Sequence, residues 1–410
     1  MLIKNIHVEN EETTKDILIK DSKFIKIAPS IDAKDEVIID GTDAMLLPPF
    51  IESHVHLDTC LTAGDPVWNM SGTLFEGIEC WSKKKATLTK EDIKSRARKA
   101  INMQVANGIQ YIRTHVDITD PSLIALEALI ELREELKDQI MIQIVAFPQE
   151  GICSYPNGKQ LMEKAVEMGA DCIGAIPHFE FTREYSVESL DFALQLAKKY
   201  NRLVDVHCDE IDDEASRGLE TLACRALELE LFDKVTASHT TAMHSYNNAY
   251  VGKLMRLLKM SKINFVANPL VNTHLQGRFD TYPKRRGVTR VKELMENGLN
   301  VSFGHDDICD PWYPLGTGNM RDVVFLGLHV CQMMGYEDIL NSYQLITYNA
   351  AKTLHIADQY GIEEGKDANF IMLDAPNFYQ ALNEKSSVLY SVHKGQILYK
   401  EQPKKGSILF

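Results

Sequence analysis

Cysteine is scarce in this sequence, and its cysteines do not have the spacing of a metal-binding or redox motif. The chain has 410 residues and only eight cysteines, and none of them forms a Cys-x-x-Cys pair. This absence disfavours a structural zinc site and a thioredoxin-like centre. Such sparse cysteines are typical of reduced thiols, so we expect a cytoplasmic protein.

Basic residues and long apolar runs are also under-represented. Lysine and arginine total 44 against 58 acidic residues, which gives a net charge of −14. Because binding to a phosphate backbone needs clustered positive charge, we expect no nucleic-acid partner. No apolar run approaches the length that spans a membrane, and the first residues do not resemble a signal peptide. Any nucleobase chemistry would therefore concern a free base.

Several catalytic motifs are missing. The sequence has no His-Glu-x-x-His, no Gly-x-Ser-x-Gly and no Walker-type phosphate loop. It also lacks the His-x-Glu and Pro-Cys-x-x-Cys pair of one nucleobase deaminase fold. If this protein deaminates a base, it uses another scaffold.

The central part of the chain alternates short apolar runs with helical patterns. Residues 90–107 illustrate the helices, since apolar positions recur on one face and Gly108 follows. Such alternation predicts repeated βα units and a parallel sheet. Eight strands in series favour an α/β fold of the (β/α)₈ TIM-barrel type, with its site at the carboxyl ends of the strands. The expected strands cover residues 45–50, 111–116, 141–147, 172–177, 203–207, 235–239, 264–268 and 299–304.

The two ends of the chain show a different pattern, with short runs of alternating polarity between polar turns. These runs predict strands and one small β domain built from both termini. We expect this domain to comprise residues 1–44 and 360–410, and the barrel to comprise residues 45–359. The runs are residues 2–6, 16–19, 37–39, 368–373, 388–392 and 396–399.

Histidines end several of the expected barrel strands. His54 and His56 are two residues apart, so on a strand both side chains point to the same face, here the barrel mouth. His207 ends an apolar strand and precedes an acidic turn, which suits a third metal ligand. His239 ends the next strand and is equally consistent with a hydrogen-bonded core residue.

Carboxylates complete this candidate site. Asp306 and Asp307 follow the eighth strand, and we expect Asp306 to bind a metal and accept a proton while Asp307 binds substrate. Glu210 lies three residues beyond His207 and is placed to line the same pocket. Imidazole and carboxylate ligands suit one Zn²⁺ or Fe²⁺ ion with an open position for water.

The expected fourth strand bears on the number of metal ions. Residues 172–180 contain no lysine of the kind that bridges two metals on this architecture, which favours a single ion. His178 and Glu180, at the end of this segment, leave a binuclear alternative open.

These motifs resemble those of the amidohydrolase superfamily, and within it those of the bacterial cytosine deaminases. The resemblance extends from about Pro48 to Tyr348. It is densest around residues 72–79, 145–151, 207–214, 238–246, 268–272, 279–287 and 304–317.

The resemblance implies a role for each candidate residue. One divalent ion, iron or zinc, would be held by His54, His56, His207 and Asp306. The catalytic residues would be Glu210, which moves a proton to the ring nitrogen, His239, which polarises the attacking water, and Asp306. The substrate would be bound by Gln149 through its amide, by Asp307 at the leaving amino group and by Trp312 at the pocket wall. Members of this family are homo-oligomers, so a hexamer is expected.

The sequence therefore predicts hydrolytic deamination of cytosine to uracil and ammonia, in pyrimidine salvage. Two alternatives remain at this point. One is deamination of a related cyclic amidine such as isoguanine or creatinine, because these bases present similar donor and acceptor edges. The other is a barrel that binds a metal or ligand without turnover.

Overall fold

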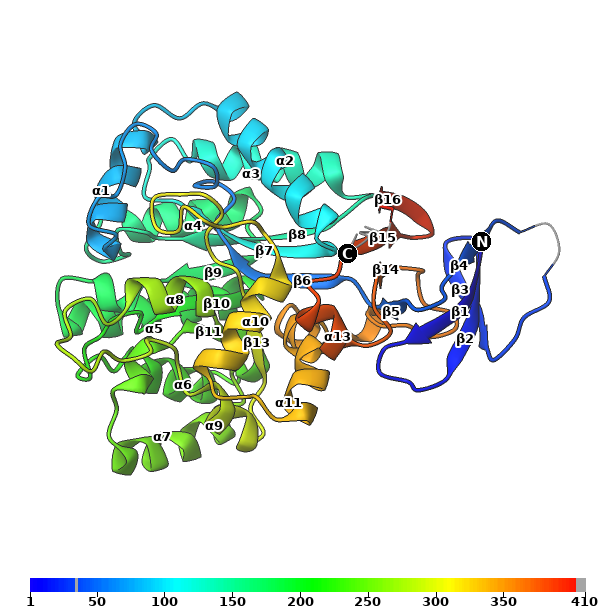
Figure 1. Cartoon of the computed structure of the whole chain (residues 1–410). Helices are drawn as coiled ribbons and strands as arrows, with labels where there is room; N and C mark the ends of the chain where they lie inside the picture. Colours follow the sequence, from blue (N-terminus) through cyan, green and yellow to red (C-terminus); the bar gives the residue numbers. More distant parts are fainter. Residues whose placement is uncertain (34–35, 403–410) are drawn as a thin grey trace, which may run out of the picture.

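The protein consists of a barrel and a smaller sheet formed by both ends of the chain (Figure 1). The computed structural model describes residues 1–33 and 36–402. In Figure 1 the barrel with its helices lies on the left, and the sheet that contains β1 lies on the right. The expected small domain includes residues 34–35 and 403–410, which lie outside the described residues.

The barrel contains eight parallel strands in sequence order, as predicted. The fold class is thus confirmed. The strands are β6 (Phe50–Val55), β7 (Ile109–Asp117), β8 (Met141–Phe147), β9 (Cys172–Ala175), β10 (Leu203–Cys208), β11 (Val235–His239), β12 (Asn264–Ala267) and β13 (Val301–Phe303). Helices surround these strands (Figure 1).

The helices of the chain lie mainly between and after the barrel strands. They are α1 (Leu74–Lys85), α2 (Lys90–Ala106), α3 (Ile124–Leu136), α4 (Gly158–Met168), α5 (Arg183–Tyr200), α6 (Gly218–Glu228), α7 (Asn248–Ser261), α8 (Pro269–Leu275), α9 (Val291–Glu296), α10 (Met320–Val330), α11 (Tyr336–Asn341), α12 (Tyr348–Thr353) and α13 (Phe378–Asn383). No helix in the described part of the chain is long and apolar enough to cross a membrane.

Helix α2 shows why these segments become helices that cover the barrel. The side chain of Thr89 accepts a hydrogen bond from the backbone N–H of Asp92, which caps the first turn. Ile93, Ala97 and Ala100 recur at helical spacing and are buried. Burying this apolar stripe against the sheet stabilises both elements, because it removes their apolar surface from water.

The barrel closes through the loop that follows β13. Val55 of β6 pairs with Asp306 in a parallel bridge. The backbone N–H of Asp306 donates to the carbonyl of His54 at 2.8 Å, and the N–H of His56 donates to the carbonyl of Asp306 at 3.0 Å. Closure therefore places Asp306 beside the two histidines that begin the candidate site.

One expected barrel strand, over residues 45–50, was wrong. Met45–Leu47 forms β5, which pairs with strands of the terminal sheet, and the barrel begins only at Phe50. Pro48 and Pro49 separate the two strands. Proline has no N–H to donate to a β ladder, so the pairing ends there and the chain passes into the barrel.

The terminal sheet joins strands from both ends of the chain. Its order is β16-β15-β14-β5-β1-β2-β3, and β4 pairs with β1. The strand β3 was not expected from the sequence. The strands are β1 (Leu2–Val8), β2 (Thr14–Lys20), β3 (Lys23–Ala28), β4 (Ile38–Asp40), β5 (Met45–Leu47), β14 (Phe370–Leu373), β15 (Val388–His393) and β16 (Gln396–Lys400). A separate apolar core that includes Ile3, Phe24 and Phe370 stabilises this sheet.

Candidate active site

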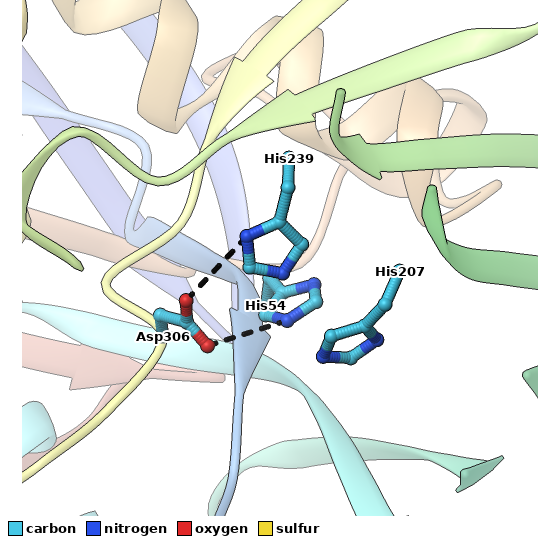
Figure 2. Close-up of side chains that lie close together, drawn as sticks. All are labelled: His54, His207, His239 and Asp306. Atoms are coloured by element: carbon cyan, nitrogen blue, oxygen red, sulfur yellow. Dashed lines mark ion pairs between the residues drawn. The ribbon is translucent and has the colours of Figure 1, made fainter. Parts of the chain in front are cut away.

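The strand ends bring three histidines and one aspartate to one point in the barrel mouth (Figure 2). Nitrogen and oxygen atoms of His54, His207, His239 and Asp306 lie within 4.8 Å of one another. The Asp306 carboxylate lies between two rings, with Oδ1 3.4 Å from His54 Nε2 and Oδ2 3.8 Å from His239 Nδ1. Residues separated by up to about 250 positions in sequence thus meet because parallel strands end at the same face.

His56 lies at the edge of the same cluster. Its Nε2 is 3.1 Å from His207 Nε2 and 3.5 Å from Asp306 Oδ1. It also forms a second group of candidate metal ligands with Asp306 and Asp307. All four residues of the predicted ligand set therefore lie together, and His239 lies among them.

Burial controls the charge of this cluster. Burial, together with the neighbouring histidines, holds the pKa of His207 well below its usual value. The pKa of His239 is lowered in the same way, chiefly by burial. Burial would raise the pKa of Asp306, but the adjacent His239 and His54 outweigh it and lower the pKa. A lowered pKa keeps His207 and His239 neutral, which is the form in which an imidazole binds a metal.

The donor atoms of the cluster fit a divalent metal ion. Among the described residues, His54 Nε2 and His207 Nδ1 are buried without a hydrogen-bond partner. Buried polar atoms are normally paired, so such unpaired nitrogens are expected where an ion binds. Imidazole nitrogens with one carboxylate match the ligand preference of zinc or ferrous iron.

The backbone is strained at two of these residues. His239 has φ +66° and Asp306 has φ +73°, which places both in the left-handed region. This conformation is costly for residues with a β-carbon, and it concentrates at functional sites. The strain therefore supports a functional role for both residues.

Glu210 reaches the cluster from the loop after β10. Its Oε1 lies 3.2 Å from Nδ1 of His239. Burial raises the pKa of Glu210 well above its ordinary value, and the negative charge of Asp306 adds to the effect. A carboxyl group kept neutral in this way can donate a proton near neutral pH.

The remaining predicted residues line one cavity above the cluster. Its walls include both polar and apolar side chains. They are His56, Leu74, Gln149, Ile176, His207, Glu210, Leu275, Asp306, Asp307 and Trp312. Every predicted substrate-binding side chain thus faces the same space as Glu210 and Asp306.

Trp312 is held by one hydrogen bond from its indole and one from its backbone. Its Nε1 donates to the carbonyl of Leu74 at 3.2 Å, and its backbone N–H donates to Asp310 Oδ1 at 3.0 Å. Asp310 also accepts hydrogen bonds from Thr59 and Tyr313. Asp310 therefore positions the pocket wall, a role that sequence reasoning missed.

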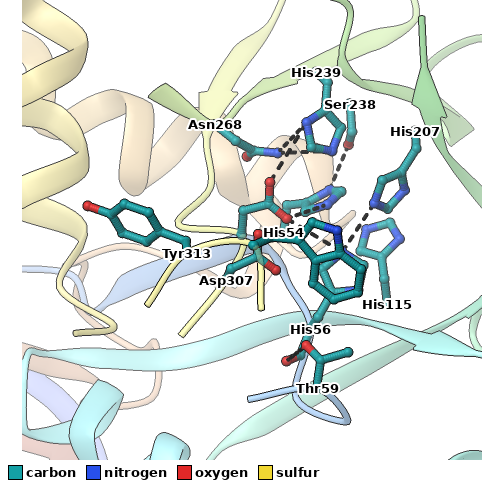
Figure 3. A network of polar contacts seen from close by, with 12 residues as sticks. His54, His56, Thr59, His115, His207, Ser238, His239, Asn268, Asp307 and Tyr313 are labelled. Atoms are coloured by element: carbon teal, nitrogen blue, oxygen red, sulfur yellow. Dashed lines mark hydrogen bonds and ion pairs between the residues drawn. The ribbon is translucent and has the colours of Figure 1, made fainter. Parts of the chain in front are cut away.

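Other polar residues at the site had no predicted role (Figure 3). The amide nitrogens of Asn268 and Asn272 lie 3.3 Å and 3.0 Å from Nδ1 of His239. The ring of His115, fully buried on β7, lies 3.9 Å from that of His54 between centroids. His115 lies inside a predicted strand, where Arg113, Thr114 and His115 form a polar run that was a usable signal.

His178 and Glu180 have other partners than a second metal. The Glu180 carboxylate accepts hydrogen bonds from the backbone of residues 152–154. His178 Nδ1 accepts one from the N–H of Glu210 at 3.3 Å. Neither belongs to a group of candidate metal ligands in the described part of the chain. These contacts account for Glu180 without a second metal, whereas Nε2 of His178 is buried without a hydrogen-bond partner among the described residues.

The sequence profile of the amidohydrolase family matches residues 37–399. The chain belongs to this family. It is accordingly a metal-dependent hydrolase, and its histidine and aspartate cluster is the expected place for a divalent ion. The match covers the barrel and the part of the terminal sheet that follows β3.

Individual amidohydrolases resemble the chain over its whole length. A solved structure of 5-methylcytosine deaminase from Klebsiella pneumoniae, liganded with 5-fluorocytosine, is 50% identical, covers 100% of this chain and 99% of that chain, and has a TM-score of 0.97. N-isopropylammelide isopropyl amidohydrolase from Pseudomonas sp. (strain ADP) is 30% identical over 98% of each chain. The predicted resemblance to cytosine deaminases is confirmed.

A glycine next to Trp312 provides a test of the pocket wall. A β-carbon added at Gly77 of α1 would collide with Cδ1 and Nε1 of the indole. Overpacking of about 1–3 kcal/mol, if relieved by moving Trp312, would raise KM roughly tenfold in Gly77→Ala. Steady-state kinetics on cytosine would measure this. Gly252→Ala on α7, where no atom lies within 4 Å of the added carbon, is the matched control; an equal KM in both variants would contradict the prediction.

Proposed function

We propose that this protein deaminates cytosine hydrolytically to uracil and ammonia, and that it also accepts 5-methylcytosine. The observation that supports this most directly is the shared cavity, in which Glu210, Gln149 and Asp307 face the histidine and aspartate cluster. The likeness to 5-methylcytosine deaminase at 50% identity supports the second substrate.

The ring and its amino group would be bound by three side chains. Gln149 carries both a carbonyl and an amide N–H₂, so it pairs with the carbonyl and N–H edge of cytosine. Asp307 would accept a hydrogen bond from the amino group, which it does even when burial raises its pKa and keeps it protonated. Trp312 would pack against the base and exclude water.

The chain supplies the proton transfers of the reaction. Glu210, neutral through burial, protonates the ring nitrogen as water adds to the amino-bearing carbon. Asp306 accepts the proton that water loses, and His239 hydrogen-bonds to the attacking oxygen. Asp306 then passes its proton to the amino nitrogen, the carbon–nitrogen bond breaks and ammonia leaves. As the new carbonyl of uracil forms, the hydroxyl on the former amino-bearing carbon returns its proton to Glu210, and the ring nitrogen keeps the proton that it received.

We propose that His54, His56, His207 and Asp306 hold one Fe²⁺ or Zn²⁺ ion. The chemistry that such an ion supplies when bound is activation of water, whose pKa falls to about 7 in favourable sites. His239 is left to act on the water, although it lies within the same group of candidate ligands.

Ammonia release would test the substrate. The metal-reconstituted protein would be assayed with cytosine, 5-methylcytosine, isoguanine and creatinine. We expect turnover of the two cytosines that stops on chelation and returns when Fe²⁺ or Zn²⁺ is added. The size of the recovered rate with each ion identifies the better cofactor.

The other outcomes of this assay are equally informative. Turnover of isoguanine or creatinine alone would preserve the mechanism and overturn the substrate. Silence on every base by protein with bound metal would favour a barrel without turnover.

We also propose that the protein acts in the cytoplasm as a homo-oligomer, as its resemblance to cytosine deaminases implies. Light scattering after size-exclusion chromatography would test this, with a hexamer expected and a monomeric mass as the contrary result.

A further inference from the structure

Below the candidate metal site, a row of buried polar groups runs into the barrel core. His54 Nδ1 lies 3.0 Å from Ser238 Oγ, and this hydroxyl donates to Asp205 Oδ1 at 2.6 Å. Asp205 Oδ2 accepts from Nη1 of Arg113 at 2.9 Å. Figure 3 shows Ser238 beside His54. All four side chains are fully buried, so water does not compete for these bonds.

We propose that Arg113, Asp205 and Ser238 hold the proton of His54 on Nδ1 and thereby keep Nε2 free to bind the metal. These are positioning residues, since none of them reaches the reacting atoms. The inference rests on the metal-dependent function proposed above, and it extends that function to residues outside the ligand set.

Arg113, at the inner end of this row, sets which group donates each hydrogen bond. An arginine side chain is always charged and can only donate hydrogen bonds. Arg113 uses its donors on partners that are all acceptors: the Gln143 side-chain oxygen, Asp205, the Thr236 hydroxyl and the Thr353 carbonyl. Asp205 faces this buried cation with Oδ2, and its Oδ1 accepts a hydrogen bond from a second donor.

The second donor to Asp205 is the Ser238 hydroxyl, and this hydrogen bond determines which nitrogen of His54 carries the proton. A serine hydroxyl has one hydrogen. Because the hydrogen of Ser238 points to Asp205, its oxygen presents only lone pairs to His54 Nδ1. The ring must therefore donate from Nδ1. In a neutral imidazole the other nitrogen then carries the lone pair, and His54 Nε2 is the atom that faces Asp306.

The plane of the His54 ring is restrained as well. The His115 ring packs against it with an interplanar angle of 31°. Nε2 of His115 lies 3.8 Å from Asp205 Oδ1, beyond hydrogen-bond distance, so this second ring acts on His54 by packing alone. Hydrogen bonding thus sets the tautomer of His54, and ring packing sets its orientation.

The zinc affinity of the Ser238→Ala variant would test the role of this row of hydrogen bonds. Partners that orient a metal-binding histidine typically contribute about 10- to 100-fold in metal affinity. We expect the Kd for Zn²⁺, measured by competition with a chromophoric chelator, to weaken by this factor. Ser302→Ala is the matched control, because Ser302 is a buried barrel serine whose partners are Phe265 and Thr353.

Thermal unfolding of both apo variants separates positioning from general stability. If Ser238 is only structural, both variants lose stability and both keep the wild-type Kd. Equal Zn²⁺ affinity in wild type and Ser238→Ala would overturn the proposal. Should Ser238→Ala fail to fold, Ser238→Cys, with a weaker hydrogen-bonding sulfur, decides in the same way: a weaker Kd supports the proposal and an unchanged Kd overturns it. Zn²⁺ binding needs no substrate, so this result stands even if cytosine is not turned over.

Discussion

The Glu210→Gln variant is expected to keep its metal and lose most of its turnover. Glutamine preserves the size of the side chain but cannot deliver a proton to the ring nitrogen. A positioned general acid contributes about 10²- to 10⁴-fold, so kcat on cytosine should fall by this factor. Because Glu210 touches His239 and belongs to no group of candidate ligands among the described residues, metal content should stay at the wild-type level.

Steady-state kinetics and metal analysis of the same preparation would check this result. Asp213→Asn is the matched control, since Asp213 is an exposed carboxylate on the same loop. We expect near wild-type kcat in the control. Full activity in Glu210→Gln would remove Glu210 from the mechanism, and loss of metal would make it a ligand rather than an acid.

The Asp306→Ala variant is expected to lose both metal and activity. Asp306 contacts His54, His56 and His239 from the loop that closes the barrel. Residues that only support a ligand contribute about 10- to 100-fold in metal affinity, so removal of a ligand itself should weaken the Kd by more than about 100-fold. Deamination should then be undetectable at metal concentrations that saturate the wild type.

Chelator competition and ammonia release would measure the two effects. Asp171→Ala serves as the control, because Asp171 precedes β9 at the opposite end of the barrel and pairs with Arg133. A tightly bound metal in Asp306→Ala would show that the histidines suffice, and would leave Asp306 only its role in proton transfer.

Much of the fold follows from local sequence pattern. Apolar runs of strand length and amphipathic segments such as residues 90–107 report on burial within a few residues, so the order of strands and helices was predictable. The boundary at residues 45–50 was not. Its apolar run reads as one strand, and only the pairing of Met45–Leu47 with β1 and β14 divides it.

The candidate site also contains residues that the sequence could predict and residues that it could not. Histidines at strand ends and the Asp306-Asp307 pair carry a signal in the sequence, because a polar residue that ends an apolar strand is unusual in a core. Asp205, Ser238 and Arg113 carry no such signal, since each lies inside its strand rather than at the end. Their significance depends on partners far away in the chain.

The sequence by itself determined which chemical groups stand at the mouth of the barrel, and hence the class of reaction. Strand and helix periodicity are local properties. They show that a residue ends a strand or helix, but they do not show which residues lie next to it in space. Only the tertiary structure decided that Asp306 pairs with the strand of His54, that His239 lies among the candidate ligands, and that a buried chain reaches His54 from below. These features arise from barrel closure and side-chain packing, in which every distance depends on several strands at once.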